Sequence, residues 1–154
     1  MAKTRNIILA VAAMAVLVFA SGFTWQTVGR HQAIHAELRT ARMEQAENAA
    51  PDGILQAQEL LARPAEQQDV TLHRAVYYPQ AQALVCFFSG EDPHRDIYLA
   101  ALPDINPTVL PASYGVTAEI FEDVPPEALA GGVVIELTDW QFESANPVVF
   151  SFDS

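Results

Sequence analysis

The sequence predicts an α+β protein with an N-terminal transmembrane helix, a helical stalk, and a small, mostly antiparallel β-rich domain containing one or two short helices. Three observations predict this class. An uncharged apolar run lies near the N-terminus, a segment rich in Ala, Glu, Gln and Arg follows it, and short β-branched and aromatic runs fill the remainder. We expect a membrane anchor over 1–25, a stalk over 26–67 and a folded domain over 68–154.

Charge and aromatic residues are unevenly distributed along the chain. The formal net charge is −11, and residues 68–154 alone carry two arginines against thirteen acids. Eleven aromatic residues lie in 68–154 and none in 26–67, so we expect the packed core in the C-terminal part. A nucleic-acid binder needs a basic patch or stripe, which this acidic sequence lacks, so we expect no nucleic-acid partner.

The N-terminal run from Ile7 to Trp25 contains 19 residues and no charge. As a helix it would span roughly 28 Å, close to the thickness of a bilayer core. Lys3 and Arg5 precede it, which places the N-terminus in the cytoplasm. The anchoring side chains we expect to meet lipid are Ile7, Leu9, Val16, Leu17, Phe19, Phe23 and Trp25.

A cleaved signal peptide is the alternative for this segment, because small residues follow the apolar run at Ala20 and Gly22. We favour the anchor, since apolar residues continue past these positions. Both interpretations export the rest of the chain. The expected location is a bacterial-type inner membrane, with the C-terminal domain on the periplasmic side.

The stalk is predicted to be helical over 26–49, which would reach roughly 36 Å from the membrane. Pro51, Asp52 and Gly53 end that helix, and a shorter, more apolar helix over Ile54–Arg63 is expected to pack on the domain. His31 and His35 are four residues apart and so share one helical face, which makes them candidate metal ligands. No third ligand completes that face, and two solvated histidines are the alternative.

The domain is predicted from five short runs rich in β-branched and aromatic residues, bounded by turn residues. Alternation of Val133, Ile135 and Leu137 with more polar neighbours is typical of a strand with one buried face. The expected strands cover 70–78, 83–88, 115–121, 133–137 and 147–152. Helices are expected over 92–102 and 126–130, and the three prolines within 103–114 predict an extended loop.

The densest polar cluster contains Asp92, His94 and Asp96, which we treat as candidate catalytic residues for a general-base hydrolase or as metal ligands. The alternative is a capped helix start, with Asp92 as the N-cap and Pro93 as the first helical residue. The only cysteine, Cys86, lies in an apolar run and is expected to be buried and inert.

Aromatic side chains supply the candidate binding surface, namely Trp140, Tyr77 and Tyr78, although we favour the alternative that they belong to a core with amphipathic rims. No dinucleotide, phosphate-loop or zinc-protease motif is present, and we expect no cofactor. The sequence therefore favours a non-enzymatic, membrane-anchored binding protein, an accessory subunit or assembly factor of an envelope complex. Its partners would be the bilayer and another membrane or envelope protein. The alternatives are a small exported hydrolase and a periplasmic module that binds carbohydrate or peptide.

Overall fold

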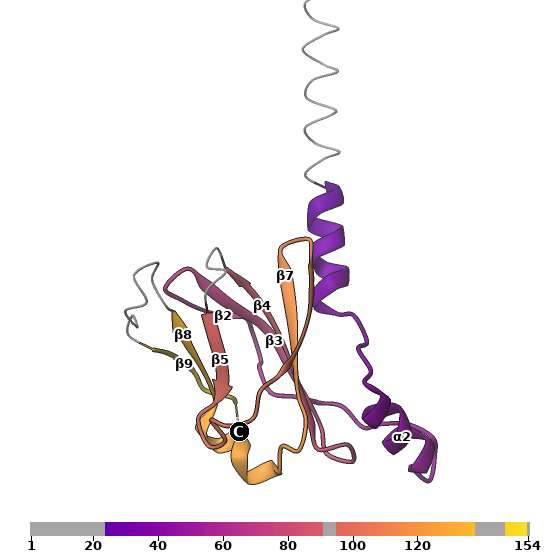
Figure 1. Ribbon diagram of the computed structural model, residues 1–154. Coiled ribbons are helices and arrows are strands. Elements are labelled where there is room, and N and C mark those ends of the chain that lie inside the picture. The colour runs from indigo at the N-terminus through magenta and orange to yellow at the C-terminus, as the bar shows by residue number, and fades with distance from the viewer. Residues whose placement is uncertain (1–23, 91–94, 138–146, 154) are drawn as a thin grey trace, which may run out of the picture.

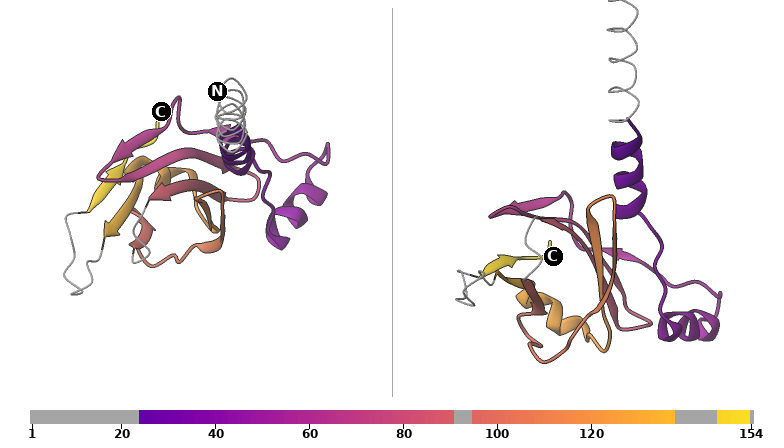
Figure 2. Two further views of the ribbon diagram at one scale, coloured as in Figure 1. Left: turned by 90° about the horizontal axis from the view of Figure 1, so that it is seen from above. Right: turned by 45° about the horizontal axis from the view of Figure 1, so that its top comes forward.

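The computed structural model describes residues 24–90, 95–137 and 147–153, which form two antiparallel β-sheets facing one another (Figures 1 and 2). The larger sheet has the order β1–β3–β4–β7–β6, and a further strand, β2, pairs with β3. Its strands are β1 (Gln58–Glu59), β2 (Ala65–Gln67), β3 (Val70–Tyr78), β4 (Ala83–Gly90), β6 (Thr108–Ser113) and β7 (Val116–Phe121). The smaller sheet consists of β5 (Arg95–Leu99), β8 (Val133–Leu137) and β9 (Val148–Phe150).

The inner face of the larger sheet packs against the smaller sheet. Large side chains from both sheets fill the space between them, including Tyr77, Phe88 and Phe121 from the larger sheet and Leu99 and Phe150 from the smaller one. All five are at most 1% exposed. The Tyr77 hydroxyl also donates to the carbonyl of Val124 at 2.7 Å, so its polar tip is satisfied inside the core.

The outer face of the larger sheet is covered by the end of helix 24–34, where Ala33 and Ile34 pack on it, and by residues 36–57, which we call the arm. Met43 and Leu55 of the arm are buried against an apolar surface that includes Val85, Phe87 and Ile120. The arm contains one regular element, α2 (Ala41–Ala49), whose N-cap Thr40 accepts a hydrogen bond from the amide of Met43. Both faces of the sheet are therefore buried, one by a second sheet and one by a largely irregular segment.

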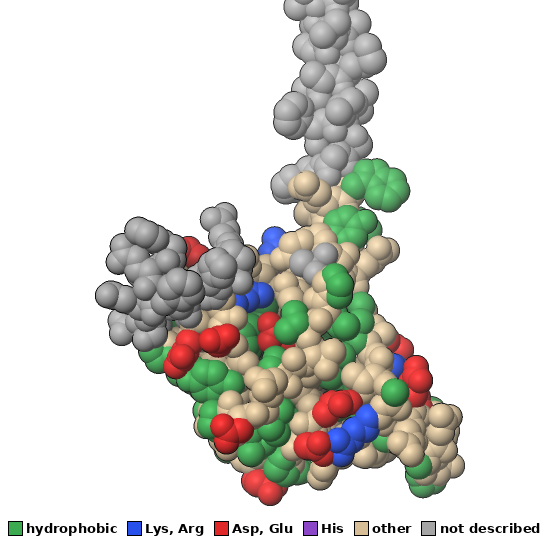
Figure 3. Space-filling view, viewed as in Figure 1, with side chains coloured by type: hydrophobic (Ala, Val, Ile, Leu, Met, Phe, Trp, Pro, Cys, Tyr) green, Lys and Arg blue, Asp and Glu red, His purple; other side chains and the backbone are tan. Residues whose placement is uncertain are grey.

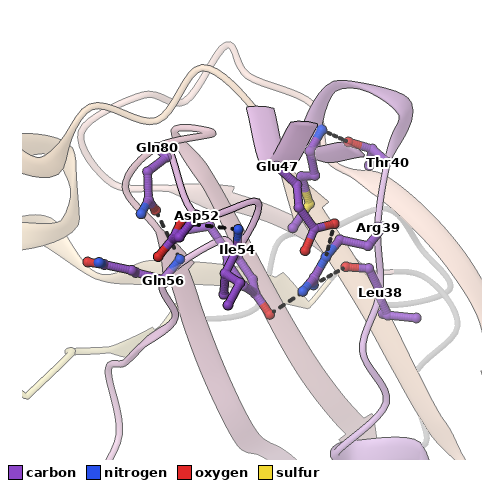
Figure 4. A network of polar contacts seen from close by, with 10 residues as sticks. Leu38, Arg39, Thr40, Glu47, Asp52, Ile54, Gln56 and Gln80 are labelled. Atoms are coloured by element: carbon purple, nitrogen blue, oxygen red, sulfur yellow. Dashed lines mark hydrogen bonds and ion pairs between the residues drawn. The ribbon is translucent and has the colours of Figure 1, made fainter. Parts of the chain in front are cut away.

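Polar contacts fix the arm at several points along the sheet (Figure 4). Arg39 donates to the hydroxyl of Tyr78 at 3.3 Å and lies 3.7 Å from the carboxylate of Glu47. The amide of Gln56 donates to the side chain of Gln80 at 3.2 Å. These bonds lie at the rim of the apolar contact, so they set the position of the arm while the buried side chains supply most of the driving force.

The predicted α+β class with a helical stalk is wrong. The protein is mostly antiparallel β-sheet with few short helices: residues 24–34, α2, and the 3-10 helix η1 (Pro126–Gly131) within the described ranges. The chain leaves its helical course after residue 34 and runs along the sheet in place of extending as a stalk. Among residues 24–90, 95–137 and 147–153, no helix is long and apolar enough to cross a membrane. The predicted anchor lies outside these ranges, apart from residues 24 and 25.

Two other predicted helices are also wrong. Residues 54–63 contain β1 and irregular chain. Leu55 is buried on the outer face of the sheet and Leu60 on the inner face, whereas a helix packed on the domain would bury both on one side. Within 92–102, residues 95–99 form β5, where Ile97 and Leu99 are buried while Asp96 is exposed. Residues 91–94 lie outside the described ranges.

The strand predictions are confirmed, with β3 and β8 matching the predicted limits and β4, β7 and β9 differing by one or two residues at some ends. The segment over 103–114 is not helical, as its prolines required, but its second half forms β6. Pro111 is tolerated there because β6 is the edge strand and its register with β7 shifts between Leu110 and Ser113. The turn over 126–130 is confirmed as η1.

Candidate functional site

Three polar side chains meet where helix 24–34 contacts the larger sheet: Arg30 from the helix, His73 from β3 and Ser89 from β4. The Arg30 guanidinium donates to the Ser89 hydroxyl at 2.7 Å. The Nε2 atom of His73 lies 2.7 Å from the same hydroxyl and 3.3 Å from the guanidinium. The three groups therefore form one hydrogen-bonded cluster between segments that are distant in sequence.

A β-bulge places His73 in this cluster. In the β3–β4 ladder Leu72 pairs with Phe88 and Arg74 pairs with Phe87, so His73 is the extra residue on β3. Bulges redirect side chains locally. As a result His73 and Arg74, although consecutive, both contact groups on the outer side of the sheet: His73 meets Ser89, and Arg74 lies over the ring of Phe87.

The direction of the hydrogen bonds follows from the chemistry of the groups. Arginine has no acceptor, so its 3.3 Å contact with His73 is a hydrogen bond only in the tautomer that has its lone pair on Nε2 and its proton on Nδ1. In that tautomer the Ser89 hydroxyl accepts from Arg30 and donates to His73, and the longer contact with Arg30 shares the same lone pair. Burial and the nearby positive charge of Arg30 both lower the pKa of His73, which keeps the ring neutral near pH 7 and suits it to accept.

The Ser89–His73 contact has the length of a nucleophile–base pair. Two features oppose that role. The Ser89 side chain is buried, and its oxygen already accepts a bond from Arg30. Among the described residues, no carboxylate is hydrogen-bonded to His73 in the position that would orient a catalytic base. The hydrogen bonds of the cluster link the helix to the sheet, and we call the three residues the joint.

A groove opens beside the joint, between helix 24–34 and the tip of the β6–β7 hairpin. It has a volume of about 560 Å³ and is lined by Gln26, Thr27, Arg30, Tyr114 and Gly115. Tyr114 and Gly115 form a two-residue turn with φ values of 52° and 75°, the left-handed pair that a tight hairpin requires. The Tyr114 ring lies directly on Gly29, where a methyl group in place of the glycine hydrogen would overlap it.

A second contact fixes the end of the same helix. Arg74 donates to the carbonyl of Ile34 at 3.5 Å and forms an ion pair with Glu59 of β1. A cation at this point satisfies one of the last carbonyl groups and interacts favourably with the helix dipole. The helix is thus held at Gly29, Arg30 and Ile34, and its orientation relative to the sheet is fixed.

An ionisable group with a strongly shifted pKa lies inside the sandwich. Glu119 of β7 is 5% exposed, and burial raises its pKa to about 7, an effect that the charge of Arg95 partly offsets. The residues on either side of it, Ala118 and Ile120, belong to the outer cluster, so Glu119 faces inward. This carboxyl group is separate from the joint.

The residues predicted from sequence lie partly outside the described ranges, and those that the structure describes occupy separate places. The rings of His31 and His35 lie 4.4 Å apart, and the described residues contain no group of three or more side chains suited to hold a metal. Tyr77 and Tyr78 are both buried and belong to opposite faces of the sheet. Asp96 is exposed on β5, while Asp92, His94 and Trp140 lie outside the described ranges.

Cys86 is fully buried in β4, and burial raises the pKa of its thiol far above the ordinary value, as its apolar run predicted. The joint itself was missed by sequence reasoning. His73 and Ser89 lie in strands that were correctly predicted, but their contact depends on the register and the bulge. The remaining signal was a glycine and an arginine adjacent in a helical segment, Gly29 and Arg30, which is weak evidence by itself.

Comparisons of the chain with family models, with curated proteins and with solved structures gave no match.

Proposed function

We propose that the protein is a membrane-anchored, extracytoplasmic binding protein, an accessory subunit or assembly factor of a cell-envelope complex. The observation that carries the proposal is the joint. Helix 24–34, which directly follows the apolar residues 7–23 in sequence, is bonded to the β-sandwich through Arg30, Ser89 and His73. A sandwich fixed in this way would be held close to the membrane surface in a defined orientation, which suits an accessory subunit.

The absence of an organised catalytic centre among the described residues also favours binding over catalysis. Within those residues the Ser89 oxygen is occupied, the thiol of Cys86 is buried, and the grouped carboxylates required for metal binding are missing. The exposed apolar side chains on helix 24–34 and β6, including Val28 and Val109, offer contact surface instead.

The location can be tested with the chain's own cysteine. Cys86 is buried and should not react with a membrane-impermeant maleimide, because the thiolate is the reactive form. A Gln45→Cys variant presents an exposed thiol on α2. We expect intact spheroplasts to label the variant and not the parent chain, and both to stay in the membrane fraction after alkaline extraction. Recovery of a shortened chain in the soluble fraction would contradict the proposal.

The accessory role is tested by mild detergent extraction of the tagged full-length chain, followed by size-exclusion chromatography and mass spectrometry. A membrane or envelope protein that co-migrates in a fixed ratio would support the proposal. Migration of the chain on its own after extraction in several detergents would contradict it.

A second candidate, a hydrolase, rests on the 2.7 Å contact between Ser89 and His73. It requires Arg30 to leave the serine oxygen when substrate binds. A fluorophosphonate probe would label Ser89 if this function is real, and Ser89→Ala would abolish the labelling. Failure of an Arg30→Gln variant to react with the probe would count against the hydrolase, because that substitution exposes the hydroxyl.

A further inference from the structure

We propose that the groove between helix 24–34 and the β6–β7 hairpin docks on the headgroup layer of a phospholipid bilayer, with Arg30 contacting a headgroup phosphate. The inference rests on the proposed membrane anchoring, and adds that the folded domain itself contacts the membrane. Four observations support it: two exposed aromatic residues, a cation that has no acidic partner among the described residues, an exposed tyrosine with a left-handed backbone at a turn, and the position of the groove in the chain.

Two aromatic residues are exposed at this end of the molecule: Tyr114 lines the groove, and Trp25 precedes the first lining residue on the helix, Gln26. Trp25 on the helix is 74% exposed, and Tyr114 on the hairpin is 58% exposed. Val28, on the same helix as Trp25, is 52% exposed. Tryptophan and tyrosine are the residues preferred at a membrane–water interface, since their rings are apolar while their edges bind water or headgroups. Figure 3 shows hydrophobic side chains along the helix on the surface that continues onto the sandwich.

Arg30 supplies the charge. The described residues form three ion pairs, and these engage Arg39, Arg42 and Arg74. Arg30 bonds to the neutral Ser89 and the neutral ring of His73, so within the described residues its positive charge has no acidic partner. A guanidinium presents several N–H groups in a planar fork that matches phosphate oxygens.

Tyr114 occupies a position where an aromatic residue is unfavourable for the isolated fold. Its φ value of 52° lies in the left-handed region, which favours asparagine or glycine in a two-residue hairpin turn. The contact with Gly29 uses only part of the residue, since 58% of Tyr114 remains exposed. The exposed part of the ring is available to a surface outside the molecule.

The placement of the groove selects a bilayer as that surface. Both the β6–β7 turn and the start of helix 24–34 lie at one end of the sandwich, whereas α2 and the β3–β4 turn lie at the other (Figure 1). The residues before the helix are the apolar segment 7–23. A bilayer that holds this segment would lie next to the groove and far from α2.

The test uses full-length protein reconstituted into phosphatidylcholine vesicles with brominated acyl chains, which quench nearby tryptophan. In a background with Trp25→Phe and Trp140→Phe, a single tryptophan is introduced by Tyr114→Trp or, as the matched control, by Gln45→Trp at the exposed surface of α2. We expect bromolipid to quench and blue-shift the emission of the tryptophan at 114 and to leave the control unchanged. Equal behaviour of the two reporters would overturn the proposal.

Three further variants test the role of Arg30. Arg30→Gln is expected to weaken quenching at 114, and Arg63→Gln, at another exposed arginine, to leave it unchanged. Ser89→Ala removes the hydrogen bond to the helix but keeps the cation, so it should preserve the quenching. Loss of quenching in Ser89→Ala equal to that in Arg30→Gln would overturn phosphate contact, because the joint alone would then account for it.

A photoreactive benzoylphenylalanine in place of Tyr114 identifies the occupant in native membranes. A phospholipid adduct supports the proposal, and an adduct with another protein or a second copy of the chain overturns it. Failure of the wider functional proposal gives a different result, since the chain would then leave the membrane fraction altogether. A chain that stays in the membrane while position 114 contacts no lipid refutes only the docking of the groove.

Discussion

The two faces of the larger sheet are covered in different ways. The inner face packs on a second sheet whose own strands are bonded to one another, and consecutive residues such as Phe87 and Phe88 alternate between the two clusters. The outer face is covered by the arm, which has one short helix and is otherwise irregular. A sheet therefore needs only apolar contact and a few polar bonds to bury a face, and regular structure in the cover is not required.

The two faces of the larger sheet should also differ in how well they tolerate changes in side-chain volume. A small cavity of about 150 Å³ adjoins Phe87, Leu38 and the edge strand β6 on the outer side. Close-packed interiors tolerate little volume change, while a cover with adjacent free space can adjust. The outer face should consequently respond to substitution less strongly than the inner face.

The largest expected effect tests this asymmetry directly. Phe88→Ala should lower the free energy of unfolding by about 3–5 kcal/mol, since both sheets hold the walls of the cavity apart. Phe87→Ala, the neighbouring residue on the outer face, should cost less because the arm can move inward. Urea unfolding of both variants measures the two values. An equal or larger loss for Phe87→Ala would break the comparison.

Glu119 adds an electrostatic cost to the inner face. Its pKa is raised from 4.5 in the unfolded chain to about 7 in the folded protein, so the folded state holds the proton more tightly. The contribution of Glu119 to the stability of the fold is therefore most favourable below about pH 4.5, and it is lost as the pH rises through 7. Since a difference of one pKa unit between the two states corresponds to about 1.4 kcal/mol, the full cost at alkaline pH is about 3 kcal/mol.

Glu119→Gln should remove that dependence. The variant is expected to be more stable than the parent at pH 8 and nearly equal to it at pH 4.5, as measured by thermal unfolding across this range. If the stabilities of the parent and of Glu119→Gln changed with pH in the same way, the carboxyl group would be ionised in the folded protein without cost.

Met43 anchors the arm, and its side chain is 0% exposed. Met43→Ala should cost about 2 kcal/mol, the lower end of the range for such a truncation, because the arm can settle over the smaller side chain. The arm should also become a preferred site of limited proteolysis before the sheets unfold. Cleavage that begins elsewhere in the variant would mean that Met43 does not hold the arm.

The smallest effects concern polar contacts of the arm. Thr40 caps α2 and donates to Glu122 at 2.5 Å, so Thr40→Ala should cost about 1 kcal/mol. The Arg42–Asp123 pair is solvent-exposed, and Arg42→Ala should leave the urea midpoint unchanged. A larger loss in Arg42→Ala than in Thr40→Ala would show that surface charge, and not the helix cap, positions the arm.

The strands were predictable because their residues carry a local signal. The period of two in residues 133–137 and the apolar run of 83–88 follow directly from burial on one or both faces. The same period was present in β5, where Ile97 and Leu99 alternate with Asp96 and Tyr98. Asp92 and Pro93 resemble a helix start, and that stronger local signal led to the wrong prediction.

The arm could not be predicted as a cover from its own composition. Residues 26–49 favour helix and contain no proline, yet the helix is interrupted over 36–40, where Leu38 turns onto the sheet and Thr40 begins a new helix. Tertiary contact outweighs propensity there. The run ALVCFF implied that both faces of a strand needed covering, and the arm is what covers the second one. The joint of Arg30, His73 and Ser89 could not be predicted either, because the contact of His73 with Ser89 depends on a β-bulge that no local sequence pattern indicates.

The joint also determines how the molecule would carry a mechanical load. Arg30 is bonded to Ser89 on β4, and β4 is flanked by β3 on one side and by β7 on the other. A pull on the N-terminal segment is thus delivered to an interior strand. That strand is held by two ladders, whereas an edge strand is held by one. A pull on the helix would therefore act first on the joint and then on the middle of the sheet.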